Sequence, residues 1–230
     1  ERARKEGHGV EQAARMLRYE FLRSAAENVG AGVVAVAHHA DDNAETVLYR
    51  IVRGTHLRGL AGIPADRSLG GSDVRLIRPL LWARREQVEA YVRRAGLEVR
   101  SDETNADVGF ARNFIRHELL PLLRERLNPR ADEALLRLAE AAGQVEDLIE
   151  QRAADVLARA VRDAAPGRLV LAADALAGEH AAVTTAALRA ALERLGAPMR
   201  SVGADRLAEL AALAEPDGGG AVTLGGGAAA

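Results

Sequence analysis

The chain of 230 residues contains no cysteine. This absence excludes disulfides, thiolate zinc sites, iron–sulfur clusters and a cysteine nucleophile within the chain, and it fits the cytoplasmic location that we expect. Lysine is almost absent as well, because Lys5 is the only lysine among 31 lysine and arginine residues. Aromatic residues make up 3% of the chain, so a core must be built from leucine, valine, isoleucine and alanine.

A strong charge of one sign is also missing. The formal net charge is -2 at pH 7, so no global positive field indicates a nucleic-acid-binding protein. Arginines nevertheless cluster locally, at 84–85, 93–94 and 112–130. No apolar run is long enough to span a bilayer, and none follows the charged residues 1–5, so we expect neither a signal peptide nor a membrane partner.

The first half of the chain alternates helical and extended patterns. Apolar spacing predicts a helix over 10–28, a buried strand over 33–37 and a second helix that ends near Arg53 and Gly54. This order is typical of an α/β fold, here part of a doubly wound parallel sheet. The other predictions are a glycine-rich loop over 54–73, a strand over 74–77, a helix over 84–95 with Val88, Tyr91, Val92 and Ala95 inward, and a helix over 110–119 that Pro121 bends or ends.

The break at Asn128-Pro129 predicts a domain boundary. We therefore expect residues 1–129 to be a portion of a catalytic domain and residues 130–230 to be a mainly helical domain that binds substrate. A long helical pattern begins at Asp132. The patterns beyond it predict a short strand over 169–171 and helices over 185–195 and 204–214.

The densest group of titratable side chains is the stretch His38-His39-Ala40-Asp41-Asp42-Asn43-Ala44-Glu45-Thr46. It follows the first predicted strand, and in parallel sheets ligands bind at the carboxyl ends of strands. Asp42 and Glu45 are spaced like a capping box, which explains both carboxylates without any catalysis. A cap does not explain two histidines and a second aspartate, so an active site or a metal site stays open. Within the predicted helix, an apolar stripe of Ala44, Val47, Leu48, Ile51 and Val52 places Asp42, Glu45 and Tyr49 on the opposite face.

Two further polar groups accompany this stretch. Ser101 to Asn105 is followed by Arg112 and Arg116, which are four positions apart and suited to clamping a phosphate or a carboxylate. A solvated helix face paired with Asp102 or Glu103 is an equally good interpretation. In the first helix, Arg15 and Arg18-Tyr19 by themselves indicate only an exposed helix face.

Taken together, these groups resemble the tRNA(Ile)-lysidine synthetase family of the N-type ATP pyrophosphatase superfamily. The resemblance covers roughly the first 130 residues, and the block from Asp102 to Pro121 is its more specific part. The residues that carry it are Ala14-Arg15, Arg18-Tyr19, His38 to Thr46, Arg53-Gly54, Gly59-Leu60, Arg78-Pro79-Leu80-Leu81, Asp102, Thr104-Asn105, Arg112-Asn113, Ile115-Arg116 and Leu120-Pro121.

The resemblance implies an adenine nucleotide alpha hydrolase-like fold and a reaction. ATP adenylates the 2-oxo group of the wobble cytidine of tRNA(Ile), and the ε-amine of L-lysine then displaces AMP to give lysidine. Asp42 and Glu45 would lie at the reacting centre, where they would handle the lysine amine or bind Mg²⁺, with Asp42 as the metal ligand. His38 would hold the nucleotide or the cytidine. The ATP and cytidine pocket would be lined by Arg18, Asn105, Arg112 and Arg116. A homodimer is a further expectation.

One departure from the family pattern is clear. The family binds ATP phosphates with a Ser-Gly-Gly-x-Asp-Ser loop, which residues 1–230 lack, and Gly70-Gly71-Ser72-Asp73 lies too far downstream to replace it. We therefore expect this piece to lack its first strand and loop, and to have little or no activity. The alternatives are a tRNA thiolase of the same superfamily, which the absence of cysteine disfavours, and a non-catalytic module that binds tRNA or a nucleotide.

Overall fold

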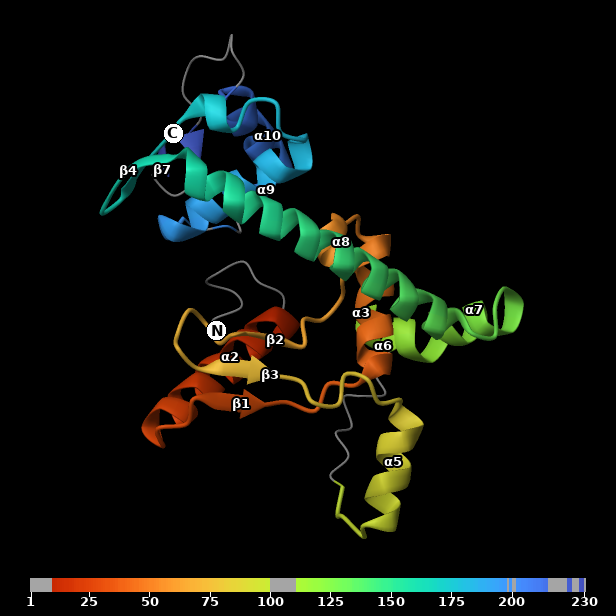
Figure 1. Ribbon diagram of the computed structural model, residues 1–230. Coiled ribbons are helices and arrows are strands. Elements are labelled where there is room, and N and C mark those ends of the chain that lie inside the picture. The colour runs from red at the N-terminus through yellow and green to blue at the C-terminus, as the bar shows by residue number, and fades with distance from the viewer. Residues whose placement is uncertain are drawn as a thin grey trace. The chain divides into compact units, whose positions relative to one another are not determined.

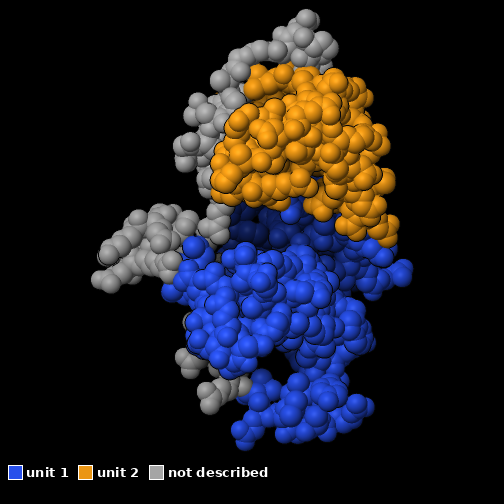
Figure 2. All heavy atoms as spheres, turned by 60° about the vertical axis from the view of Figure 1, so that its left-hand side comes forward, with its two compact units in different colours: residues 1–143 blue, residues 144–230 orange. Residues whose placement is uncertain are grey.

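The computed structural model describes residues 10–99, 111–197, 199, 202–214, 223–224 and 228–229. The chain forms two compact units, residues 1–143 and 144–230, which are coloured separately in Figure 2. Helix α8 (Ala131–Ala160) runs through the division between them. The contacts therefore divide the chain inside a helix and not at Asn128-Pro129, where α7 ends and α8 begins. A division by contacts does not locate functions, so the boundary at residue 129 between a catalytic and a substrate-binding part stays a prediction.

The first unit contains a small mixed sheet. Its strand order is β1-β3-β2, where β1 is Val33–Ala35, β3 is Arg75–Ile77 and β2 is Asp66–Ser68. Strands β1 and β3 are parallel, and β2 is antiparallel to β3. Helix α2 (Val10–Asn28) lies beside this sheet in Figure 1. The predicted α/β class, with strands over 33–37 and 74–77, is thereby confirmed.

The sheet and α2 enclose an aliphatic core. Four residues are almost completely buried there, Ala26, Leu69, Val74 and Leu76. Tyr19 and Leu22 of α2 pack against this cluster. As the composition predicts, this core is built mainly from small and branched aliphatic side chains, which pack closely.

The glycine-rich connection over 54–73 is more ordered than the sequence indicates. It contains the short helix α4 (Leu57–Leu60) and strand β2, whereas the pattern predicts only a loop. Gly62 has a φ of +75°, and an added Cβ would lie 2.2 Å from Asn43 Oδ1. That oxygen accepts a hydrogen bond of 2.7 Å from the backbone N–H of Ile63. Asn43 of the polar stretch therefore fixes this connection and is a structural residue.

Helix α3 (Ala40–Val52) follows β1 directly, as predicted. Its apolar stripe is buried at Ala44, Val47 and Leu48 but not at its end, since Ile51 is 39% exposed. The predicted faces are also only partly right: Glu45, expected on the polar face, is 2% exposed. A carboxylate buried in this way needs cationic partners.

A continuous helical path follows the segment 100–110. It consists of α6 (Ala111–Phe114), a π-helical turn (Ile115–Leu119) and α7 (Leu120–Arg126). The helical path does not end at Pro121, which was one of the two predicted outcomes, because Pro121 lies in the first turn of α7. A proline at this position has no N–H to donate to the preceding turn. The backbone N–H of Leu120, the residue before it, donates to the carbonyl oxygen of Ile115. The π turn thus accommodates the proline within one helical path.

Helix α5 (Arg85–Arg94) has the predicted position but a different packing. None of its residues is buried, and Tyr91, which the periodicity places inward, is 59% exposed. The inward prediction for its apolar face is therefore wrong. Periodicity shows that a helix has an apolar face, but it does not show whether a neighbouring element covers that face.

The second unit is mainly helical. Besides the end of α8 it contains strands β4 (Val161–Ala165) and β5 (Arg168–Leu171), a 3-10 turn (Ala173–Ala175), helices α9 (Ala181–Arg194) and α10 (Ala204–Ala212), and the two-residue strands β6 (Thr223–Leu224) and β7 (Ala228–Ala229). Strand β4, which forms an antiparallel hairpin with β5, was not predicted. The core of this unit is made of apolar side chains of α8 and α9, among them Val156, Leu157 and Leu188. Within the described residues, no helix is both long and apolar enough to cross a membrane.

Candidate active site

The start of α3 is fixed by His39 and Asp42. The backbone N–H of His39 donates to Asp42 Oδ2 at 2.9 Å, and the backbone N–H of Asp42 donates to His39 Nδ1 at 3.4 Å. The capping box expected for Asp42 and Glu45 is thus formed by His39 and Asp42, one turn earlier. Burial lowers the pKa of His39, which Asp42 opposes, and its Nδ1 accepts the N–H of Asp42. With the cap formed by these two, Glu45 is not needed for it.

Arg112 and Arg116 bind the two carboxylates of this helix. Arg112 donates from Nε to Glu45 Oε2 and from Nη2 to Asp42 Oδ1, both at 3.0 Å. Arg116 donates to both oxygens of Glu45, at 2.6 and 2.8 Å, and to Asp42 Oδ1 at 3.2 Å. The two arginines therefore clamp carboxylates, which is one of the two kinds of ligand that their spacing in the sequence allowed. Their alternative partners, Asp102 and Glu103, lie outside the described residues.

This four-residue group, which we call the carboxylate network, is closely neutralised. Glu45 is 2% exposed, and Arg85 adds a third cation at 3.8 Å from its Oε1. The hydrogen bond to Glu45 raises the pKa of Arg116 above its usual value. A buried carboxylate is stable only with such partners, because removing one of them leaves an uncompensated charge in a poorly solvated site.

His38 lies beside the carboxylate network but, unlike its members, carries no charge near pH 7. Burial lowers its pKa to about 4, although the nearby charge of Asp42 acts in the opposite direction. The imidazole is therefore neutral near pH 7. Its Nδ1 is buried and has no hydrogen-bond partner among the described residues. A neutral imidazole with an unused ring nitrogen can accept or donate one hydrogen bond to a ligand.

Sequence reasoning did not find a second ion-pair group that adjoins the first. Asp41 Oδ2 accepts the backbone N–H of Arg85 at 2.7 Å, at the start of α5, and Arg84 reaches Asp41 Oδ1 at 3.0 Å. Asp132 of α8 is 3% exposed and binds Arg124 of α7 through both oxygens, at 2.6 and 2.7 Å. No spacing rule could have found these pairs, because each joins residues of separate elements.

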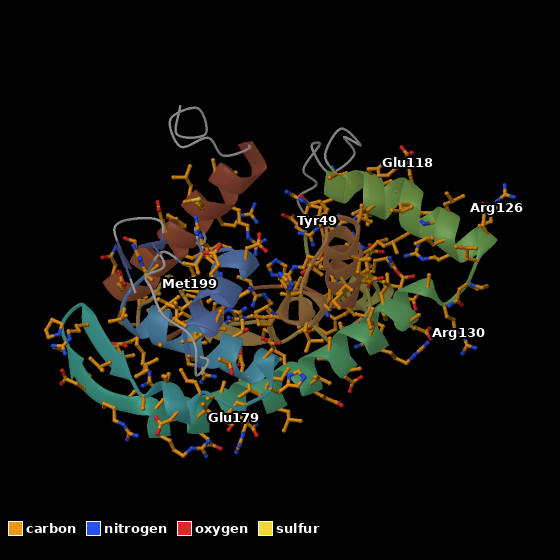
Figure 3. The ribbon with its side chains drawn as sticks, turned by 90° about the horizontal axis from the view of Figure 1, so that it is seen from above. Tyr49, Glu118, Arg126, Arg130, Glu179 and Met199 are labelled. Atoms are coloured by element: carbon orange, nitrogen blue, oxygen red, sulfur yellow. The ribbon has the colours of Figure 1, made fainter. Side chains whose placement is uncertain are left out.

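The same helices also carry arginines that point outward. Figure 3 shows Arg126 and Arg130, near the turn between α7 and α8, pointing away from the helices. Arg124, two positions before Arg126, instead pairs with buried Asp132. Sequence position alone therefore does not separate the structural arginines of this cluster from the solvated ones.

A cavity of about 550 Å³ adjoins the carboxylate network. Its volume suits a small molecule, but its lining is charged and not apolar, unlike that of most ligand pockets. Glu45, Arg116, Asp41 and Arg84 contribute to its wall. Arg84 Nη1 is buried and has no partner among the described residues, which leaves a donor available there.

The remaining predicted site residues are not brought to the network. Arg18 is exposed on α2 and makes no hydrogen bond or ion pair with the described residues. Asn105 lies outside the described residues.

The sequence also left open a metal site at the start of α3. No group of three or more histidine and acidic side chains in the described ranges could hold an ion, and both oxygens of Asp42 already accept hydrogen bonds. Mg²⁺ usually binds through only one or two carboxylates together with phosphates, so the assignment of Mg²⁺ to Asp42 stays a prediction.

Comparison with known families gives two matches. A model described as the PP-loop domain matches residues 1–123. A model described as the TilS substrate binding domain matches residues 171–230. The first covers more than half of the chain, and the second lies within the second compact unit.

Comparison with individual proteins gives one consistent description. The chain is 43% identical over 166 residues to a tRNA(Ile)-lysidine synthase of Geobacillus kaustophilus, covering 70% of this chain and 35% of that protein. Proteins with the same description from Porphyromonas gingivalis (46% over 138 residues, 60% of this chain and 29% of that protein) and Geobacter sulfurreducens (42% over 170 residues, 74% and 35%) are also similar. The chain thus spans about a third of the length of these curated relatives.

Proposed function

This chain belongs to the PP-loop domain family, and on that premise we propose that it is part of an enzyme that ligates lysine to the wobble cytidine of tRNA(Ile). In that reaction the 2-oxo group of the cytidine is adenylated by ATP with release of pyrophosphate. The ε-amine of L-lysine then displaces AMP and forms lysidine. The relatives named lysidine synthases, and the match to their substrate-binding domain, support this choice over a tRNA thiolase.

The observation that carries the proposal is the carboxylate network beside the neutral His38. An attacking amine must arrive unprotonated or lose a proton, so it needs a proton acceptor within reach, and a carboxylate can be that acceptor. The side chain of Asp42 is 13% exposed and that of Glu45 only 2%. We therefore propose that Asp42 meets the lysine amine and accepts its proton, and that Glu45 holds the arginines in place.

The arginines have the chemistry for a charged nucleotide. Arg112 and Arg116 carry planar guanidinium groups that bind phosphate oxygens as readily as carboxylates. In the proposed reaction they neutralise the charge that develops when pyrophosphate or AMP leaves. His38 offers its unused ring nitrogen to the nucleotide or the cytidine. Arg18 and Asn105 stay predicted members of the same pocket.

ATP is the proposed cosubstrate, and tRNA(Ile) and L-lysine are the proposed partners. Mg²⁺ commonly binds through phosphates and only one or two carboxylates, so we propose that it enters with ATP and we assign no step to it. The division of labour between residues 1–129 and 130–230, and a homodimer, remain proposals of the same kind.

The test uses the whole protein that contains this chain. We expect AMP to be released only when ATP, L-lysine and tRNA(Ile) are all present, and the tRNA to gain the mass of lysine less one water. Without AMP release from the cognate tRNA, the synthetase proposal fails. If tRNA binding persists in that case, the alternative of a non-catalytic tRNA-binding module is supported.

A further inference from the structure

Three arginines from different elements meet at Tyr19 of α2. The guanidinium carbons of Arg15 and Arg67 lie 5.1 and 4.9 Å from the centre of its ring. Arg78, which directly follows β3, lies close enough to the Tyr19 hydroxyl to lower its pKa. We call Arg15, Tyr19, Arg67 and Arg78 the Tyr19 cluster.

The cluster contains three positive charges without a negative one. Among the described side chains from residue 13 onward, no carboxylate pairs with Arg15, Arg67 or Arg78. The neighbouring acid Asp66 is paired with Arg75. A contact between an arginine and an aromatic ring contributes little at an exposed site. Such contacts with a neutral ring do not cancel the repulsion between the cations, so an anion bound among them would be stabilised.

Arg78 is the most constrained member. It is 3% exposed, and its Nη1 donates to the carbonyl oxygen of Pro64 at 2.5 Å. Its Nε is buried without a partner among the described residues. A buried cation with an unpaired donor is costly unless a ligand satisfies it.

The position of the cluster also favours a ligand. Arg78 and His38 follow the carboxyl ends of the parallel strands β3 and β1, the edge at which α/β sheets bind ligands. Arg15 is exposed and Arg67 is half-buried, so an anion can reach them from solvent. The charges of Arg78 and Arg15 both act on His38.

From these contacts we propose that the Tyr19 cluster is a binding site for a phosphate group. Arginine favours this class of anion, because its planar fork of donors matches two oxygens at once. The site is additional to the proposed reaction, since none of the arginines assigned to the nucleotide and cytidine pocket belongs to it. The phosphate can come from a free polyphosphate or from an RNA backbone, which share this chemistry.

The test measures binding to the 230-residue chain by titration calorimetry at low salt. Inorganic pyrophosphate and a short single-stranded RNA are the two probes, and the variant is Arg67→Gln. The matched control is Arg93→Gln, which removes the same charge from an exposed position on α5. We expect Arg67→Gln to weaken binding of at least one probe about tenfold, as the loss of a charge-assisted hydrogen bond does, and Arg93→Gln to leave it within about twofold.

Each outcome has a defined meaning. An effect on pyrophosphate supports a polyphosphate site, and an effect on RNA alone supports a backbone site. Equal weakening by both variants would mean that only the long-range field matters, and it would overturn the proposal. Absence of binding to the unchanged chain would overturn it too. Because no turnover is measured, these results do not depend on whether lysidine is formed.

A second readout follows the tyrosine itself. Burial raises the pKa of Tyr19, but the charges of Arg15 and Arg78 outweigh it, and the pKa lies below its usual value. A bound phosphate offsets those cations, so pyrophosphate or RNA should shift the ultraviolet titration of Tyr19 to higher pH. Tyr19→Phe identifies the signal among the three tyrosines of the chain. If saturating probe leaves this titration unchanged, the anion does not bind at Tyr19.

Discussion

Two groups of arginines in the first unit show how differently one residue type can be used. In the carboxylate network, Arg112 and Arg116 are held by Asp42 and Glu45 at 2.6–3.2 Å. In the Tyr19 cluster, three arginines face a neutral ring and no described carboxylate. The first group is neutralised by the fold, whereas the second is left for a ligand to neutralise. Removing a charge should therefore destabilise the first group and relieve the second.

The largest effect is expected from Arg116→Ala. This change leaves Glu45 buried with one cation fewer, and breaking a buried pair costs about 3–5 kcal/mol. Urea unfolding of the 230-residue chain measures the loss. Arg126→Ala, at an exposed arginine of the same helical path, should stay within about 0.5 kcal/mol. Equal losses for the two variants would show that the network does not contribute to stability.

Asp42→Asn separates catalysis from capping in the same network. Asparagine keeps an oxygen that can accept the N–H of His39, but it loses the charge that pairs with Arg112 and Arg116. Stability should therefore fall, though by less than in Arg116→Ala, because Glu45 still pairs with both arginines. The negative charge for the lysine amine is lost, and turnover of the whole protein should fall by at least about a hundredfold. Asp73→Asn, at an exposed aspartate, is the control for AMP release. Full activity in Asp42→Asn would mean that Asp42 is only a cap.

The pH dependence of stability tests the neutral state of His38. Its pKa is about 4 in the folded protein, against 6.5 as the ordinary value. Between these values the unfolded chain binds a proton that the folded chain does not, so stability should fall as the pH decreases from 6.5 towards 4. His38→Gln should flatten this slope in urea unfolding.

The smallest effect is expected at the Tyr19 cluster. Pyrophosphate that binds only the folded state should stabilise it by roughly 1.4 kcal/mol at ten times its dissociation constant. Arg67→Gln should lose most of this gain at the same pyrophosphate concentration, while its stability without ligand is unchanged or slightly higher because repulsion is relieved. A loss of stability in the absence of ligand would contradict the contrast between the two groups.

The sequence predicted the local structure and the family, and it did so for local reasons. The strand, the glycine and the apolar spacing around His38 to Val52 are short-range patterns, and they placed β1 and α3 correctly. The family resemblance then agreed with the match to the PP-loop domain. The candidate residues Asp42, Glu45, Arg112 and Arg116 were also found in this way, because their types and spacing are visible in the chain.

Only the tertiary structure decided what these residues contact. Contacts between separate elements leave no periodic trace in a sequence, and this applies to the pairing of Arg116 with Glu45, to the Asp41 cap of α5 and to the three arginines around Tyr19. The burial of Glu45 and the exposure of Tyr91 were misjudged for the same reason, since each depends on which neighbour covers a face. Helical spacing fixes the direction of a side chain along its own helix, and packing alone fixes the charge and the solvent that it meets there.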